Sequence, residues 1–286
     1  MGKARTTETA SRTMPDDAGA VAERPAPYFI SDQRDFILYH GDALEVLPNI
    51  ADASVDLIFA DPPYFLSNGG VTCQSGKMVS VNKGGWDRLE SVEAMHEFNR
   101  AWLTTCRTAL QPNGVIWVSG TRHVIYSVGF AMQEIGFKLL NEITWEKPNP
   151  PPNLSCRYFT HSTETILWAA RDPKSRHKFN YQLMRSHAKD RQMKSVWQFT
   201  APTAAEKQFG KAHPTQKPLA LLERIILASS DAGDLIVDPF VGSGTTGIAA
   251  TRHGRRFIGI DTEARFLDLA IKRYRASLNQ QQEALK

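Results

Sequence analysis

Residues 61–64 read Asp-Pro-Pro-Tyr and directly follow an apolar run, VDLIFA. Proline has no backbone N–H for a sheet and disfavours helix in the residue before it, so the strand must end at Asp61 in a stiff, extended turn. Such a turn holds a carboxylate, two free backbone carbonyls and an aromatic ring in fixed relation. Several hydrogen-bond acceptors beside the face of an aromatic ring suit the binding of a planar amine. The candidate catalytic residues are therefore Asp61, Pro62, Pro63 and Tyr64.

A second pattern, DLIVDPFVGSGTTG, covers residues 234–247. Gly242, Gly244 and Gly247 satisfy G-x-G-x-x-G after a predicted strand, and Asp261 ends the next strand 19 positions after Gly242. This arrangement predicts a nucleoside cofactor, with the ligand close to the glycine backbone and its ribose hydroxyls on Asp261.

The identity of that ligand has three alternatives. A nicotinamide dinucleotide fits the glycines, but Asp238 lies where its pyrophosphate would be repelled, and the roughly 40 residues after Gly247 are too few for its remaining strands. S-adenosylmethionine carries an ammonium that suits Asp238. A tight strand–helix turn without a ligand is the third alternative.

Short apolar runs alternate with helical patterns along the chain, which predicts a mostly parallel sheet with helices on both faces. Strands are expected at 36–40, 55–60, 114–119, 139–145, 164–170, 234–238 and 255–261, and helices at 93–110, 123–135, 218–230, 244–253 and 263–278. The helix at 218–230 has Pro218 at its predicted first position and Gly233 beyond its end. The turn at Gly242–Gly247, here called the glycine turn, comes late in the chain, whereas the strand before Asp-Pro-Pro-Tyr comes early. The order of a dinucleotide-binding fold is therefore circularly permuted.

Composition limits the class of protein. With 286 residues and 42% hydrophobic side chains, the chain can bury one large α/β core. We expect a disordered tail over 1–27 and one domain over 28–286. No apolar run is long enough for a bilayer and no leader opens the sequence, so we expect a cytoplasmic protein away from membranes. Neither the three cysteines nor the eight histidines show metal-ligand spacing, so no metal is expected.

Positive charge is concentrated in one segment. Eleven Lys or Arg and three acids lie between Arg171 and Lys217, an excess of eight positive charges in a chain whose net charge is +4. Aromatic residues are interleaved with them, which suits phosphate contact and base stacking, although a solvated basic insertion has the same composition. The predicted insertion covers about 171–212, and its candidate DNA-binding residues are Lys174, Arg176, Lys178, Arg185, Lys189, Arg191 and Lys194.

Together, DPPY and DPFVGSG resemble the catalytic and cofactor motifs of amino-methyltransferases that act on nucleic-acid bases. The early DPPY, the late DPFVGSGTT and the basic segment between them are similar to the beta group of N6-adenine DNA methyltransferases, from about Tyr28 to the final helix. FLSNGG and SCRYFTHSTETILWA are similar to GATC methylases of Dpn-type restriction systems. The resemblance implies a Rossmann-like fold that binds S-adenosylmethionine. It also implies a double-stranded or single-stranded DNA substrate, a homodimer, and a restriction–modification or orphan methylase.

The resemblance also implies roles for individual residues. Asp61 and the Pro62 carbonyl would accept the two hydrogens of the target amine, and Tyr64 would stack on the flipped base. Asp42 matches the acid that pairs with the cofactor adenine, although a helix cap is an equal alternative. Lys217 matches a residue that closes the cofactor pocket, although such a lysine is more often at the surface. The implied cofactor-binding residues are Asp42, Lys217, Asp238, Phe240, Gly242, Ser243, Gly244, Thr245 and Asp261.

Other functions remain open from the sequence. An N4-cytosine methyltransferase performs a similar reaction, but aspartate as the first motif residue favours adenine. An RNA-base methyltransferase and a non-catalytic DNA-binding module are further alternatives. The acids Asp238 and Asp261 argue against the latter, since a DNA-binding module has no need of them.

Overall fold

The computed structural model describes residues 25–65, 71–74, 77–80, 91–207, 209 and 216–284. Within them, a nine-stranded sheet has the order β1-β2-β11-β10-β3-β6-β8-β7-β9. Five of its eight neighbouring pairs are parallel, and β8 is antiparallel to both β6 and β7. The strands are β1 (Phe29–Ile30), β2 (Phe36–His40), β3 (Val55–Ala60), β6 (Leu110–Gly120), β7 (Lys138–Glu146), β8 (Thr163–Ala170), β9 (Val196–Gln198), β10 (Leu235–Asp238) and β11 (Arg256–Asp261).

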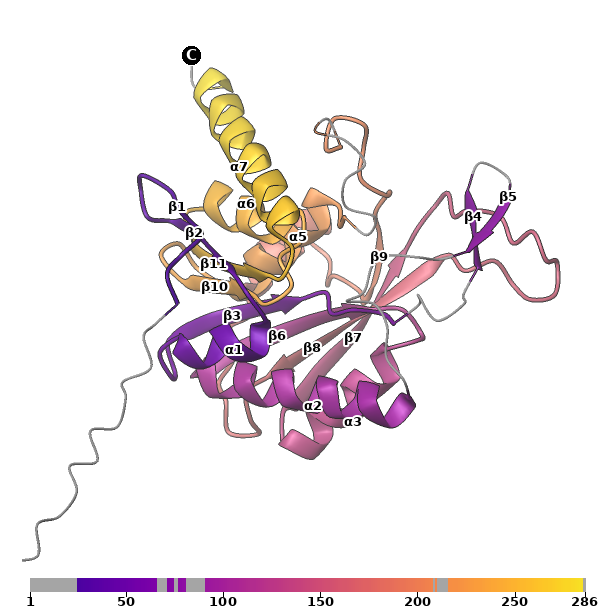
Figure 1. The fold of residues 1–286 in the computed structure, drawn as a ribbon, viewed down its shortest axis with the longest axis horizontal. Helices are drawn as coiled ribbons and strands as arrows, with labels where there is room; N and C mark the ends of the chain where they lie inside the picture. The colour runs from indigo at the N-terminus through magenta and orange to yellow at the C-terminus, as the bar shows by residue number, and fades with distance from the viewer. Residues whose placement is uncertain are drawn as a thin grey trace, which may run out of the picture.

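Helices cover both faces of the sheet, as Figure 1 shows. One face carries α1 (Ala43–Val46), α2 (Val92–Ala109) and α3 (Ile125–Ile135), with the 3-10 turn η1 (Leu47–Asn49) beside α1. The other carries α5 (Leu219–Ser229), α6 (Thr245–Arg252) and α7 (Ala264–Ala284), and α4 (Tyr181–His187) packs against α5. These observations confirm the predicted class, a Rossmann-like α/β fold with a mostly parallel sheet and a permuted motif order.

Burial on both faces explains the continuous apolar runs. In β3, Leu57 and Phe59 belong to the core beneath α5, α6 and α7, whereas Ile58 and Ala60 belong to the core beneath α2 and α3. Side chains alternate between the faces of a strand, so a strand covered on both sides needs an apolar residue at every position. The sequence therefore lacks the alternation of a half-exposed strand.

All the predicted strands and helices are present, with ends that differ by a few residues. Pro218 is the N-cap of α5 rather than its first residue, because its ψ of 138° is extended. Gly233, with φ of +87°, lies in the turn before β10. The largest difference is in α7, which continues to Ala284 rather than ending near 278.

Several short elements were not predicted. They are β1, α4, β9 and the antiparallel hairpin of β4 (Val71–Gln74) with β5 (Lys77–Ser80). Because β9 pairs with β7 and α4 packs on α5, both elements of the basic segment contact the rest of the domain, and the segment's role as a target-recognition insertion stays a prediction. Of the predicted tail, residues 1–24 lie outside the described residues, and 25–27 have no regular secondary structure. Helices of the described residues are all too short or too polar to cross a bilayer.

Candidate active site

The two sequence motifs meet at one edge of the sheet. Strands β3 and β10 are parallel neighbours with Ile58 opposite Val237, so Asp61 just beyond β3 lies near Asp238 at the end of β10. Ligands of open α/β sheets bind at this carboxyl edge. The structure thus brings the predicted catalytic turn next to the predicted cofactor turn.

Asp61 is held by two hydrogen bonds. Tyr64 donates its hydroxyl to Asp61 Oδ1 at 2.5 Å, and Lys217 Nζ donates to Asp61 Oδ2 at 2.5 Å. Lys217 Nζ also donates to the Tyr64 hydroxyl at 2.9 Å. Tyr64 is only 5% exposed, and its burial beside Asp61 and Glu164 raises its pKa well above the usual value. Its predicted role in stacking on a base stays a prediction, as do the roles of Pro62 and Pro63.

Lys217 contacts the Asp61–Tyr64 turn rather than the glycine turn. It is 6% exposed, and its ammonium lies 3.6 Å from Glu164 Oε2 as well as on Asp61. Burial by itself favours the neutral amine, but the carboxylates of Asp61 and Glu164 outweigh this effect and raise the pKa of Lys217. The predicted closure of a cofactor pocket by this residue stays a prediction.

Glu164 and Lys147 complete the charged group, and sequence reasoning missed both. Lys147 on the connection after β7 pairs with Glu164 Oε1 near the start of β8. Burial opposes ionisation of Glu164, yet Lys217 and Lys147 hold its pKa below the usual value. Glu164 Oε2 is buried and has no hydrogen-bond partner among the described residues. No sequence motif could have revealed this group, because its members meet only through the antiparallel direction of β8.

The glycine turn is shaped by both conformation and close packing. Gly242 and Gly244 have φ of +48° and +78°, a region that favours glycine. A Cβ on Gly244 would lie 2.7 Å from that of Ala270 on α7. Asp261 accepts hydrogen bonds from the backbone N–H groups of Gly242 at 2.8 Å and Glu263 at 2.9 Å. Burial raises the pKa of Asp261 to about 6 despite these bonds.

Asp238 is a buried carboxyl with no ionic partner among the described residues. It accepts hydrogen bonds from the Thr246 hydroxyl at 2.5 Å and the Phe240 N–H at 3.0 Å. Burial raises its pKa to about 7, against the effect of these bonds and together with the repulsion from Asp61 and Asp261. A cationic ligand placed here would favour the ionised form, so the site suits an ammonium.

Other predicted cofactor residues have defined neighbours. Arg273 of α7 donates to the Ser243 carbonyl at 2.6 Å and to the Thr245 hydroxyl at 2.9 Å. The Thr245 side chain is therefore occupied, and contact with a ligand would come from backbone N–H groups at the start of α6. Asp42 caps α1 by accepting from the Leu44 N–H at 2.8 Å. This bond is the capping alternative, and contact with a cofactor adenine stays a prediction.

An aromatic cluster lies under both motifs. Phe240 packs edge-on against Trp102 of α2 at 5.4 Å between ring centroids, and Phe98 contacts both Phe240 and Phe65. Phe65 directly follows the catalytic turn and has φ of +53°, an uncommon conformation for a phenylalanine. Residues of one helix, α2, thus pack against residues of both turns.

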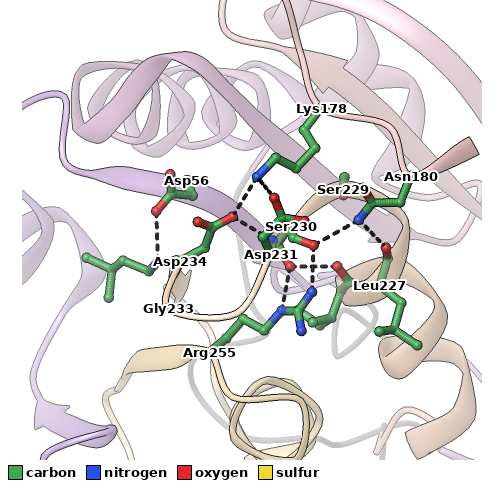
Figure 2. Close-up of polar contacts among 12 residues, drawn as sticks. Asp56, Lys178, Asn180, Leu227, Ser229, Ser230, Asp231, Gly233, Asp234 and Arg255 are labelled. Carbon is green, nitrogen blue, oxygen red and sulfur yellow. Dashed lines mark hydrogen bonds and ion pairs between the residues drawn. The ribbon is translucent and has the colours of Figure 1, made fainter. Parts of the chain in front are cut away.

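Three of the predicted DNA-binding residues lie at the opposite edge of the sheet. After β8 the chain leaves near Pro112 and Asn113, where the Arg176 N–H donates to Asn113 Oδ1 at 2.8 Å. Figure 2 shows Lys178 between Asp231 and Asp234, just before β10 begins. Lys174, Arg176 and Lys178 are thus not brought to the edge that carries Asp61. Arg185, Lys189, Arg191 and Lys194 follow along α4 toward β9.

Figure 2 also shows the hydrogen bonds that this opposite edge makes with the end of α5. Asn180 donates to the carbonyls of Leu227 and Ser230, and Arg255 donates to the Ser230 carbonyl at 2.6 Å. These bonds satisfy carbonyls at the end of α5, which have no partner within the helix. The start of the basic segment therefore fastens α5 to the sheet.

The fold is Rossmann-like, and its mostly parallel sheet carries the acidic Asp-Pro-Pro-Tyr turn beside the glycine turn. Such a site binds a nucleotide-type ligand and suits the transfer of a chemical group. Residues 55–272 match the family described as DNA methylase, whose name joins N6 and N4 methyltransferases. The chain is 57% identical to the Type II methyltransferase M2.LlaDCHI of Lactococcus lactis subsp. cremoris, over 86% of this chain and 91% of that protein. It is likewise 57% identical to the Type II methyltransferase M2.DpnII of Streptococcus pneumoniae, over 87% and 92%.

A solved structure agrees with these relatives. The crystal structure of an M1.HpyAVI–SAM complex superposes with a TM-score of 0.64 and 28% identity, covering 83% of this chain and 98% of that one. The protein belongs to the DNA methylase family.

The buried charges at this site predict a large and pH-dependent loss of stability in Lys217→Met. The variant leaves Asp61 and Glu164 without their shared ammonium, and breaking such a buried pair costs about 3–5 kcal/mol. Since Lys217 lowers the pKa of Glu164, its contribution is present at neutral pH and fades as the pH falls. The contribution is complete above about pH 4.5, the ordinary pKa of a glutamate, so urea unfolding should show a smaller loss at about pH 3.5 than at about pH 7.

Lys178→Met is the matched control, because it also removes a lysine paired with two carboxylates. Its side chain is 40% exposed, so we expect a loss of about 0–1 kcal/mol. Equal losses in the two variants would contradict the view that Lys217 is energetically distinct.

Proposed function

We propose that this protein is a site-specific DNA methyltransferase that transfers a methyl group from S-adenosylmethionine to N6 of an adenine flipped out of the duplex. The observation that carries the proposal is the position of the acceptor-rich Asp61 turn next to a buried Asp238 with no cationic partner among the described residues. The relatives, which are Type II methyltransferases, and the SAM complex support it.

The residues at the glycine turn fit this cofactor. When bound, S-adenosylmethionine supplies an electrophilic methyl group on a sulfonium. Asp238 would hold its ammonium, the N–H groups at the start of α6 its carboxylate, and Asp261 its ribose. The raised pKa values of Asp238 and Asp261 support this assignment, since both carboxyls gain from a ligand that donates hydrogen bonds or positive charge.

At the catalytic turn, Asp61 would accept one hydrogen of the target amine and the Pro62 carbonyl the other. Two acceptors draw the nitrogen lone pair out of the ring and toward the methyl group, so the rate enhancement comes from alignment and charge placement. Asp61 is also placed to take the proton that the amine loses. Aspartate as the first motif residue favours adenine, whereas the family includes N4 methyltransferases as the second candidate.

Both carboxylate oxygens of Asp61 are engaged before a base binds, so one partner must move. Lys217 is the mobile candidate, since Glu164 Oε2 lies 3.6 Å from its ammonium and lacks a hydrogen bond to any described residue. A shift of about 1 Å would bring Nζ to the usual distance of a charged hydrogen bond. Glu164 would thus receive Lys217 as the amine takes its place on Asp61.

DNA is the proposed substrate, double-stranded in the first instance. Single-stranded DNA as an alternative substrate and the homodimer stay predictions from the resemblance, and a cytoplasmic location stays a prediction from the composition.

The function itself is tested by methyl transfer from labelled S-adenosylmethionine to duplex DNA, with the product base identified by mass spectrometry. We expect N6-methyladenine, and a loss of about 10²–10⁴-fold in Asp61→Asn with unchanged cofactor affinity. Asp268→Asn, a surface carboxylate bonded to Tyr28, is the control. N4-methylcytosine would indicate the second candidate, and binding of DNA without any methylated product would reject the enzyme.

Cofactor affinity should first rise and then fall as the pH increases. Below about pH 7 Asp238 must lose a proton to pair with the ammonium, so the affinity should rise up to about tenfold per pH unit. Above about pH 8 the ammonium of the ligand loses its own proton and the affinity should fall. Calorimetry with Asp238→Asn should show weaker binding and no acid limb. An acid limb that persists in this variant would assign the titration to Asp261 instead.

Glu164→Gln tests the proposed movement of Lys217. The neutral amide cannot attract the ammonium from Asp61, so we expect kcat to fall about tenfold while KM for the cofactor stays the same. Lys147→Met keeps the Glu164 charge and should lower kcat far less. Equal effects of the two variants on kcat, or a loss confined to folding stability, would show that Glu164 has only a structural role.

A further inference from the structure

The connection between β7 and β8, residues 147–162, rises from the catalytic edge. Its base is closed by the Lys147 N–H, which donates to the Ser162 carbonyl at 2.7 Å. Glu164, two residues further on, contacts Lys217 in the site. In Figure 1 this loop projects beyond the end of the sheet that carries the tips of β7 and β9.

The tip of this β7–β8 loop exposes aromatic side chains. Phe159 is 96% exposed and its neighbour Tyr158 is 60% exposed. Burial of a phenylalanine ring is favourable, so a ring this exposed beside the site would gain by contact with a binding partner. Single exposed apolar residues are common, but here the exposed ring lies on the edge where a substrate must arrive.

The tip is held in shape by its own hydrogen bonds. Asn153 donates to the Tyr158 carbonyl at 2.5 Å and accepts from the Ser155 N–H at 3.1 Å. The ring of Tyr158 packs on that of His161 at 5.2 Å between centroids. Phe159 is therefore presented by an organised turn, which lowers the ordering cost of using it in binding.

The charge of the loop suits a polyanion. Lys147 and Arg157 lie in it, and no Asp or Glu occurs between Glu146 and Glu164. By contrast, Lys178 at the opposite edge already pairs with Asp231 and Asp234. Phosphate contacts near the reacting base are thus more available to the β7–β8 loop than to the first part of the basic segment.

We propose that the β7–β8 loop enters DNA at the target base pair, with Phe159 filling the space that the flipped base leaves and Arg157 contacting a phosphate. This inference rests on the proposed function. Extruding a base loses its stacking and pairing, and an aromatic ring stacked in the gap restores part of the lost stacking. Apolar wedges between base steps are a known means of distorting a duplex.

The test compares Phe159→Ala with Phe179→Ala, a phenylalanine 43% exposed at the opposite edge of the sheet. Methylation is measured on a duplex that the wild-type protein methylates. Flipping is measured by fluorescence on a second duplex of the same sequence, in which 2-aminopurine, which has no amine at position 6, replaces the target adenine. We expect Phe159→Ala to lower the flipping signal and kcat/KM for DNA about tenfold, with cofactor affinity unchanged. Phe179→Ala should match the wild type. A target base that is already mismatched should restore most of the activity of Phe159→Ala, because the flipping cost is then smaller.

The outcomes separate the two proposals. If the wild-type protein methylates DNA and Phe159→Ala flips and methylates like it, the role of the loop is rejected while the function stands. If Phe159→Ala loses activity equally on matched and mismatched DNA, the ring does not act in base extrusion and the proposal also fails. If the wild-type protein transfers no methyl group to DNA, the proposed function fails first.

Discussion

The parallel pairing of β3 with β10 is the constraint on which the site depends. Carboxyl ends of parallel strands meet at the same edge, so the register of Ile58 with Val237 brings Asp61 and Asp238 together from opposite ends of the chain. The two carboxyl groups have different surroundings. Asp61 is paired with an ammonium, whereas Asp238 is buried with neutral hydrogen-bond donors and its pKa is raised. One acid is therefore organised for an amine, and the other suits a cationic ligand.

The charge balance around Asp61 is unusual for a protein interior. Two lysines and two carboxylates, Lys217, Lys147, Asp61 and Glu164, neutralise one another with little exposure to solvent. Buried ion pairs seldom stabilise a fold more than apolar residues of similar size would, because desolvation cancels most of the attraction. A role in positioning Asp61 accounts for this arrangement better than stability does.

The reversed direction of β8 decides which segments reach the edge of the sheet that carries Asp61. Because β8 runs antiparallel to β6 and β7, its first residues and the loop before it lie beside Asp61, and the residues after it emerge at the far edge. Glu164 and Phe159 thus belong to the catalytic side. Lys174, Arg176 and Lys178 are close to them in sequence but lie at the other end of the sheet. There Lys178 pairs with Asp231 and Asp234 just after α5, and the Arg176 N–H donates to Asn113.

The sequence by itself determined the elements and the two motifs, because their signals are local. Apolar runs mark the strands, the prolines at 62 and 63 end β3, and the glycines at 242 and 244 define a turn that few other residues can adopt. Tertiary structure alone decided that Lys217 contacts Asp61, that Glu164 and Lys147 join it, and that the basic segment begins at the edge of the sheet opposite Asp61. These outcomes depend on strand order and direction, which are set by packing between separate segments, 156 positions apart for Lys217 and Asp61, and leave no pattern in any short stretch of the chain.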